Sequence, residues 1–277
     1  SKKEEYTIHD INILENCERI KYLFLCTKAN ESVNYLREIL NSFKVDNLVL
    51  TQNGIGLEDE VLRVFNGNLY YLTLTAGMEF NDNKLVIFNP KKSEIVLTKV
   101  REDEKIYKWD LDLGFKYVFF RVFDNHLSVR FSKLILNLIL NVVPVAFGGL
   151  PWEVFPKNEE AVKFEKNLIK EVYFLVKSLK IPFFDFRGYS TKMISLFYAY
   201  SPYRVFKFLY SKPGFLMGLR DGRAPSFYRD LFLRKQSTEV EYYLGWYKSE
   251  KFSNFKLETV EKIYNMIKDK EKLVLSS

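Results

Sequence analysis

The sequence predicts a protein of two domains, an α/β domain followed by an all-helical one. Between residues 20 and 125, apolar runs with strand character alternate with helical patterns. From about Phe131 onward only the helical period recurs. A length of 277 residues suffices for two domains of medium size. We therefore expect the first domain to cover residues 1–127 and the second to cover residues 128–277.

The elements expected in the first domain follow from local patterns. A buried strand, a helix and a second strand are predicted, in this order, at residues 20–27, 32–43 and 47–52. The second strand ends in the turn Asn53-Gly-Ile-Gly56, whose glycines allow close backbone approach, and an acidic helical segment follows. Further strands, the later ones antiparallel, are predicted at residues 69–78, 84–89 and 93–100.

The second domain begins with the most apolar stretch of the chain, residues 131–150. Three amphipathic helices are predicted by apolar residues that recur every three and four positions, at residues 161–180, 227–244 and 257–273. Residues 181–225 contain several prolines and glycines among many aromatic residues, which favours shorter helices and loops.

Three polar side chains interrupt the apolar stretch at intervals of four residues. A single helix over this stretch would carry Lys133, Asn137 and Asn141 on one apolar face. Buried polar groups need partners, since an unpaired group costs several kcal/mol. Two interpretations stay open at this point: hydrogen bonds between packed helices, or a wet cleft that holds a ligand.

Composition excludes several classes of function. The net charge of +7 comes from basic residues scattered among acidic ones, so we expect no nucleic-acid binding. The only cysteines and histidines are Cys17, Cys26, His9 and His126. Such a set argues against a disulfide scaffold, a metal site and a Ser-His-Asp triad, and it fits a reducing cytoplasm. Polar residues divide the longest apolar run, so no membrane span is expected.

Three motifs occur in a fixed order along the chain. Gln52-Asn-Gly-Ile-Gly56 follows a strand, Lys-x3-Asn-x3-Asn begins at Lys133, and a Pro-Ser-x3-Asp…Ser-Thr-Glu segment runs from Pro225 to Glu239. Together, over about residues 22–267, they resemble the ketopantoate reductase (2-dehydropantoate 2-reductase) family. The resemblance implies a Rossmann-type dinucleotide-binding domain followed by a helical substrate and dimerisation domain. It also implies a cytoplasmic homodimer that uses NADPH to reduce a 2-oxo acid, as ketopantoate is reduced to pantoate in pantothenate and coenzyme A biosynthesis.

The resemblance also implies roles for particular residues, which would meet in a cleft between the domains. Catalysis would rest on Lys133, as general acid, and on Glu239, which supports it. The implied substrate-binding residues are Asn137, Asn141, Ser226 and Asn53, the implied cofactor-binding residues are Lys28 and Asn53, and no metal is implied.

The chemistry of hydride transfer agrees with these roles. Negative charge develops on the carbonyl oxygen of the 2-oxo acid, and a positioned ammonium group neutralises that charge and supplies the proton. Asn137 and Asn141 offer neutral hydrogen-bond donors and acceptors that suit a carboxylate or hydroxyl group.

The sequence departs from the family pattern in its glycine-rich motif. It contains no GxGxxG, whose glycines let a helix N-terminus approach the pyrophosphate, and we expect the first strand, the first helix and the second strand of the family pattern to be absent. We expect a chain that begins partway through a longer protein. The alternative is a catalytically inactive relative that acts as a dimeric binding or regulatory protein. Two lesser departures are Leu244, where the family usually has asparagine, and the aromatic residues 183–217. An aromatic wall would suit a 2-oxo acid other than ketopantoate, whereas the commoner use of such residues is core packing between helices.

Overall fold

The computed structural model describes residues 18–75, 77–81, 84–88, 93–100 and 118–276. They fold into two compact units. Unit 1 contains the described residues up to Asn53, together with Leu57–Arg130 and Asp185–Tyr189. Unit 2 contains Gly54–Gly56, Phe131–Phe184 and the described residues from Ser190 onward. The assignment of residues 1–127 and 128–277 to a cofactor domain and a substrate domain stays a prediction.

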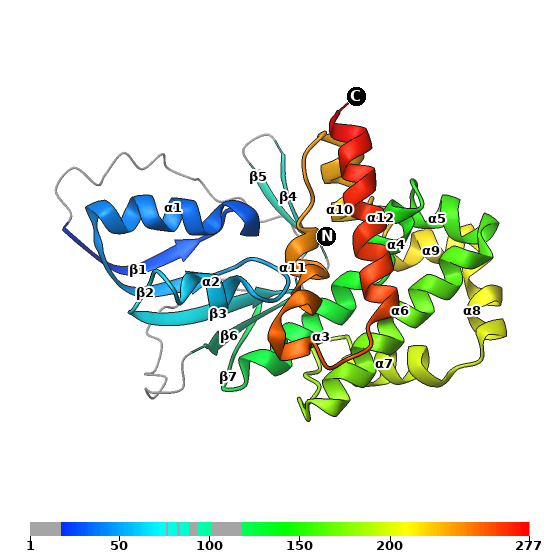
Figure 1. Ribbon diagram of the computed structural model, residues 1–277, viewed down its shortest axis with the longest axis horizontal. Helices are drawn as coiled ribbons and strands as arrows, with labels where there is room; N and C mark the ends of the chain where they lie inside the picture. The colour runs from blue at the N-terminus through cyan, green and yellow to red at the C-terminus, as the bar shows by residue number, and fades with distance from the viewer. Residues whose placement is uncertain (1–17, 76, 82–83, 89–92, 101–117, 277) are drawn as a thin grey trace. The chain divides into compact units, whose positions relative to one another are not determined.

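Unit 1 is built on a five-stranded mixed sheet (Figure 1). Its strands, in spatial order, are β1 (Arg19–Leu25), β2 (Lys44–Leu50), β3 (Asn68–Leu74), β6 (Glu94–Lys99) and β7 (Phe119–Phe123). The first three run parallel, β6 is antiparallel to β3, and β7 is parallel to β6. The helices α1 (Ala29–Ser42) and α2 (Leu57–Val61) connect the parallel strands. A separate antiparallel pair consists of β4 (Gly77–Asn81) and β5 (Lys84–Phe88).

The core of unit 1 follows from strands that are buried on both faces. All six residues of β6 are buried, although only the central three, Ile95–Leu97, are apolar. One face of the sheet carries a cluster of buried side chains, namely Val49, Tyr70, Leu72, Ile95, Leu97 and Val118. Glu94 is fully buried, and it is ion-paired with Arg121 and accepts a hydrogen bond from the backbone N–H of Arg187 at 2.7 Å.

Unit 2 is helical, and two long amphipathic helices organise it. Its elements are α3 (His126–Leu138, whose first turn belongs to unit 1), α4 (Val142–Ala146), α5 (Pro151–Val154), η3 (Phe155–Lys157), α6 (Glu159–Ser178), α7 (Thr191–Tyr200), α8 (Tyr203–Tyr210), α9 (Pro213–Leu219), α10 (Ser226–Tyr228), η4 (Arg229–Leu233), α11 (Val240–Tyr243), η5 (Gly245–Lys248), η6 (Glu250–Phe252) and α12 (Glu258–Leu275). Helix α12 packs against α4 and α6 (Figure 1). The Glu171 carboxylate of α6 accepts hydrogen bonds from the N–H groups of Thr259 and Val260, which caps the start of α12.

The predicted fold class, α/β followed by all-α, is confirmed. The predicted helices 161–180 and 257–273 correspond to α6 and α12, and the antiparallel direction of the later strands is confirmed. The predicted strand 69–78 is wrong in its extent, because β3 ends at Leu74 and β4 begins at Gly77. The strand β7 was not predicted. Residue 89, at the end of a predicted strand, and Cys17 and His9 lie outside the described residues.

The interpretation of residues 131–150 as a single helix is also wrong. Helix α3 ends at Leu138, Leu140 has a left-handed backbone (φ 53°), and α4 begins at Val142. In a continuous helix the ring of Pro144 would clash with the carbonyl group of Leu140 and remove its hydrogen bond. In the first turn of α4, by contrast, a missing N–H costs little. Asn141 therefore precedes α4 and does not lie on the helix face that carries Lys133.

The predicted helix 227–244 is broken as well. It divides into α10, the π-helical turn η4 and α11, with Lys235 in a left-handed conformation (φ 53°) between them. The N–H of Gln236 returns to the carbonyl oxygen of Asp230 at 2.9 Å, which closes the end of η4. Thr238 is held by a distant carboxylate, that of Glu271. The amphipathic period does not reveal these contacts.

Candidate functional site

Two of the predicted site residues lie at the carboxyl ends of neighbouring parallel strands in unit 1. Lys28 follows β1 and is the N-cap residue of the 14-residue helix α1, while Asn53 follows β2. Ligands of open α/β sheets bind at this edge. The ammonium nitrogen of Lys28 is buried, and its carbonyl oxygen accepts a hydrogen bond from the Ser32 hydroxyl at 2.9 Å.

Gln52 ties the two strand ends together. Its side-chain amide donates to the carbonyl oxygens of Leu25 at 2.8 Å and Thr27 at 3.0 Å. The carbonyl oxygen of Gln52 accepts a hydrogen bond from the buried guanidinium group of Arg130 at 2.8 Å. Arg130 also lies 3.8 Å from the centroid of the Tyr71 ring, a cation–π contact. This support was not predicted, because the sequence pattern does not connect position 130 with position 52.

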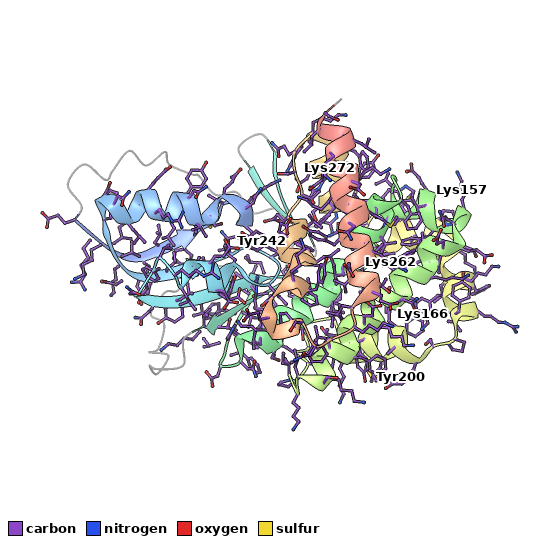
Figure 2. The ribbon with its side chains drawn as sticks, in the orientation of Figure 1. Lys157, Lys166, Tyr200, Tyr242, Lys262 and Lys272 are labelled. Atoms are coloured by element: carbon purple, nitrogen blue, oxygen red, sulfur yellow. The ribbon has the colours of Figure 1, made fainter. Side chains whose placement is uncertain are left out.

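The glycine-containing turn after Asn53 packs closely against the backbone of Tyr242. Gly54 has φ 88°, and a Cβ atom at this position would lie 2.3 Å from the carbonyl oxygen of Tyr242. The N–H of Ile55 donates to the same oxygen at 2.7 Å. Tyr242 (Figure 2) belongs to α11, the helix that begins directly after Glu239. Close approach by the glycine backbone is thereby confirmed, and its partner is the α11 backbone.

Asn141 and Ser226 meet in unit 2, although 85 positions separate them in the sequence. The Asn141 side chain is 4% exposed, and its Nδ2 donates to Ser226 Oγ at 3.2 Å and to the carbonyl oxygen of Asn137 at 2.9 Å. Its Oδ1 accepts from the N–H of Phe227 at 3.3 Å. Ser226 is the first residue of α10, directly after the N-cap residue Pro225.

The predicted catalytic pair lies on two elements of unit 2. Lys133 lies on α3 one turn before Asn137, and Glu239 is the N-cap residue of α11; both are partly buried. Convergence of this pair on Asn141 and Ser226, and the predicted cleft between domains, stay predictions.

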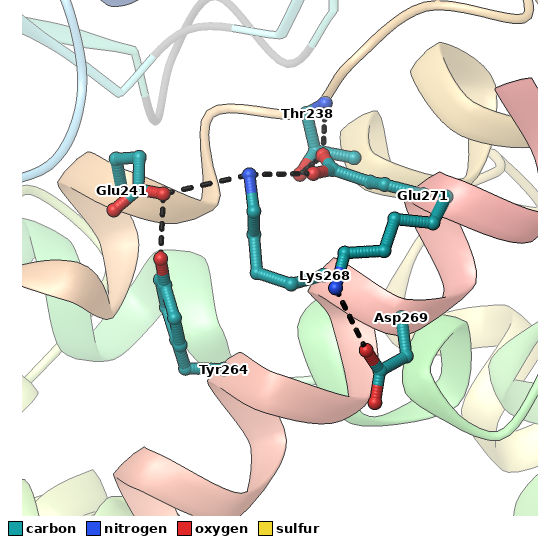
Figure 3. A network of polar contacts seen from close by, with 7 residues as sticks. Thr238, Glu241, Tyr264, Lys268, Asp269 and Glu271 are labelled. Carbon is teal, nitrogen blue, oxygen red and sulfur yellow. Dashed lines mark hydrogen bonds and ion pairs between the residues drawn. The ribbon is translucent and has the colours of Figure 1, made fainter.

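Thr238, the residue before Glu239, is held by a network of polar side chains on α12 (Figure 3). The buried Glu271 carboxylate accepts hydrogen bonds from the N–H of Thr238 at 2.6 Å and from its hydroxyl at 2.7 Å. Lys268 lies 3.1 Å from Glu271 and 3.5 Å from Glu241, which also accepts a hydrogen bond from the Tyr264 hydroxyl at 2.6 Å. Glu271 therefore fixes the backbone that enters α11.

A second buried carboxylate holds the backbone before Asn141. Glu165 of α6 is fully buried, and its Oε1 accepts a hydrogen bond from the N–H of Leu140 at 2.6 Å. This contact gives a hydrogen-bond acceptor to the backbone N–H of Leu140, the left-handed residue at which the apolar stretch changes direction. Burial raises the pKa of Glu165 to about 8. Both carboxylates act on residues adjacent to predicted site residues, and neither was found from the sequence.

Other features of the described residues point to no further chemistry. Within the described part of the chain, no group of three His, Cys, Asp or Glu side chains could hold a metal ion, and no helix is both long and apolar enough to cross a bilayer. An open surface hollow of about 1030 Å³ in unit 1 is lined by residues such as Arg19, Lys44 and Asn68. These residues begin β1, β2 and β3, so the hollow lies at the sheet edge opposite Lys28.

A mixed sheet of Rossmann-like type followed by a helical unit is the architecture of a class of dinucleotide-dependent reductases. The sequence profile of one such family, described as ketopantoate reductase PanE/ApbA, matches residues 2–101. The resemblance to the ketopantoate reductase family is thereby confirmed. No curated protein sequence matches the chain.

Solved structures share the fold over most of the chain. A D-mandelate dehydrogenase, solved with NADH and anilino(oxo)acetate, has a TM-score of 0.70 at 18% identity, covering 94% of this chain and 79% of its own. A putative 2-dehydropantoate 2-reductase from Enterococcus faecalis has a TM-score of 0.61 at 20% identity, covering 95% and 79%. A dimeric ketopantoate reductase from Staphylococcus aureus has a TM-score of 0.61 at 14% identity, covering 92% and 79%. At these identities the likeness shows the fold.

Proposed function

We propose that this protein is an NADPH-dependent reductase of a 2-oxo acid, similar to a ketopantoate reductase. The observation that carries the proposal is the contact between Asn141 and Ser226. These residues come from two separate motifs of the resemblance, and they meet as a polar pair in which Asn141 is buried and Ser226 is partly buried. The D-mandelate dehydrogenase structure contains NADH and anilino(oxo)acetate, a carboxylate with an adjacent carbonyl group, which supports a substrate of that kind.

Each residue has a defined task in the proposed reaction. Lys133 donates a proton to the carbonyl oxygen of the substrate as negative charge forms there. Glu239 supports the ammonium group of Lys133 and the hydroxyl group of the substrate. Asn137, Asn141 and Ser226 orient the substrate through neutral hydrogen bonds, which hold a carboxylate without adding charge. Asn53, which follows β2, binds both the substrate and the cofactor.

The residues at the strand ends fit a dinucleotide. The buried ammonium nitrogen of Lys28 and the start of the 14-residue helix α1 supply positive charge at the carboxyl edge of parallel strands. A negatively charged nucleotide group suits that environment. NADPH would supply the hydride, and Lys28 and Asn53 are the residues that would hold it.

Oxidation of NADPH in the presence of a panel of 2-oxo acids, ketopantoate among them, tests the proposal, with turnover followed by the loss of NADPH absorbance. We expect turnover by the protein and a reduction of kcat by roughly 10²–10⁴-fold in Lys133→Ala, because the ammonium group acts mainly as charge forms. The matched control is Lys157→Ala, which removes an exposed lysine from the same helical unit. An unchanged kcat in Lys133→Ala would remove this residue from the mechanism.

A homodimer and a cytoplasmic location belong to the same proposal. The support for the dimer is the dimeric reductase from Staphylococcus aureus. Light scattering on the protein as it elutes from a size-exclusion column measures its mass directly. A monomer at micromolar concentration would contradict the proposed homodimer. Absence of turnover with every 2-oxo acid would favour an inactive relative with a binding or regulatory role.

A further inference from the structure

Two peptide groups at the carboxyl ends of β1 and β2 lead directly into the residues of the proposed cofactor site. The carbonyl group of Thr27 belongs to the same peptide unit as the N–H of Lys28. The carbonyl group of Gln52 belongs to the same peptide unit as the N–H of Asn53. Because a peptide unit is planar, a hydrogen bond to its carbonyl oxygen also fixes the direction of its N–H. A group that holds either oxygen therefore orients the backbone that enters the site.

Both carbonyl oxygens are held by buried side chains of unit 1. The amide Nε2 of Gln52 donates to the carbonyl oxygen of Thr27 at 3.0 Å and to that of Leu25 at 2.8 Å. The amide Oε1 of Gln52 accepts a hydrogen bond from the N–H of Thr51 at 3.0 Å, so this side chain is fixed at both of its polar atoms. The carbonyl oxygen of Gln52 accepts in turn from Nη1 of Arg130 at 2.8 Å. Gln52 thus joins the two strand ends, and Arg130 holds Gln52.

The guanidinium group of Arg130 is supported from its other side by an aromatic ring. It lies 3.8 Å from the centroid of the Tyr71 ring on β3, and the Tyr71 hydroxyl donates to the carboxylate of Glu58 on α2 at 3.0 Å. All four side chains in this series, from Glu58 through Tyr71 and Arg130 to Gln52, are buried. A buried cation is retained where hydrogen bonds and aromatic faces compensate its lost hydration. The series therefore holds the guanidinium group against the Gln52 carbonyl.

We propose that Arg130 is a positioning residue of the cofactor site, which fixes the backbone entering Asn53 directly and the backbone entering Lys28 through Gln52. The inference rests on the proposed binding of NADPH by Lys28 and Asn53. The hydrogen bond from Arg130 is charge-assisted, and such bonds are roughly twice as strong as neutral ones. Without it the two strand ends would exchange among several conformations. Binding of a ligand would then have to order them, which lowers affinity.

Hydrogen exchange measured by mass spectrometry tests the positioning without any ligand. In Arg130→Met, exchange in residues 26–29 and 51–54 should become faster by about tenfold relative to exchange in β6, because the ordering contact is lost only at the strand ends. Arg130→Lys keeps the charge and a donor, so its increase should be smaller. The matched control is Arg19→Met, which removes an exposed arginine, ion-paired with Asp46, from the opposite end of the strands. It should leave both segments unchanged.

Titration with NADPH, followed by fluorescence, tests the consequence for the cofactor. The Kd for NADPH should rise by about tenfold in Arg130→Met, rise less in Arg130→Lys and stay unchanged in Arg19→Met. A double substitution separates positioning from a general loss of stability. In the Asn53→Ala background, Arg130→Met should raise the Kd by only about threefold or less, because one of the groups that it positions is already absent. A general loss of stability would give the same factor in both backgrounds.

Two results would overturn the inference: exchange at the strand ends that rises no more than exchange in β6, or an unchanged Kd for NADPH in a folded Arg130→Met protein. Circular dichroism establishes that the variants are folded, and if Arg130→Met does not fold, the same two results in Arg130→Lys decide. The outcome is separable from that of the proposed function. Faster exchange at the strand ends, in a protein whose wild type binds no NADPH, contradicts the reductase and leaves Arg130 as the residue that orders these ends. Binding of NADPH with an unchanged Kd in the variant removes Arg130 alone.

Discussion

Replacing Glu165 with glutamine is expected to remove a pH-dependent loss of stability from this protein. The carboxyl group is fully buried, its Oε1 accepts a hydrogen bond from the N–H of Leu140, and its Oε2 has no hydrogen-bond partner among the described residues. The groups that act on it are Arg220 and the hydroxyls of Tyr198 and Tyr210, which lie 2.5 Å from each other. Burial disfavours the charged form, and it raises the pKa of Glu165 to about 8.

The sign of the effect follows from proton linkage. A carboxyl group whose pKa is higher in the folded chain contributes stability that is fully present below its unfolded pKa, and this contribution is lost as the pH rises through the folded pKa. The rise in pKa from 4.5 to about 8 corresponds to a loss of about 5 kcal/mol between these pH values, at roughly 1.36 kcal/mol per pKa unit. This amount is comparable with the whole free energy of unfolding of a typical domain.

Urea unfolding at pH 5.5 and at pH 8.5, followed by circular dichroism, measures the effect. Glu165→Gln keeps an oxygen acceptor for Leu140 and cannot ionise, so at pH 5.5 it should lie within about 1–3 kcal/mol of the wild type. Between pH 5.5 and pH 8.5 the difference in unfolding free energy should shift by about 3 kcal/mol in favour of Glu165→Gln, because only the wild type must keep a carboxyl group of pKa about 8 buried. Glu160→Gln, an exposed substitution on the same helix, controls for the change in net charge. If the difference between wild type and Glu165→Gln were independent of pH, the reasoning would be refuted.

Two further predictions concern the backbone next to the site. Gly54→Ala should destabilise the protein by about 2 kcal/mol or more, because its Cβ would lie 2.3 Å from the carbonyl oxygen of Tyr242 at a φ of 88°; an unchanged thermal midpoint would contradict this contact. Glu271→Leu should cost about 1–3 kcal/mol for each donor of Thr238 that loses its acceptor, whereas exposed Asp269→Asn, measured in the same denaturation assay, should cost less than about 0.5 kcal/mol. Equal effects of these two substitutions would exclude a specific role for Glu271.

Local patterns in the sequence determined the order of the elements and the identity of the long ones. The apolar repeat of three and four residues located α6 and α12, since a helix buries one stripe of side chains wherever it packs. Apolar runs located β1, β2 and β6, of which β6 is buried along its whole length. The prediction of a buried strand is wrong for β1, because β1 lies at the edge of the sheet and only its Leu25 is buried. Motif spacing also selected Asn141 and Ser226, whose contact supports the proposed substrate site.

Tertiary structure alone decided where the chain bends next to the site, because the partners that hold those bends lie far away in the sequence. Pro144 in the sequence already disfavours a continuous helix. The sequence does not show, however, that the backbone N–H of the left-handed Leu140 donates a hydrogen bond to Glu165, 25 positions later. Thr238 is likewise held by Glu271, 33 positions later. Periodicity reports which face of an element is buried, but it carries no information about which buried carboxylate will accept a given N–H.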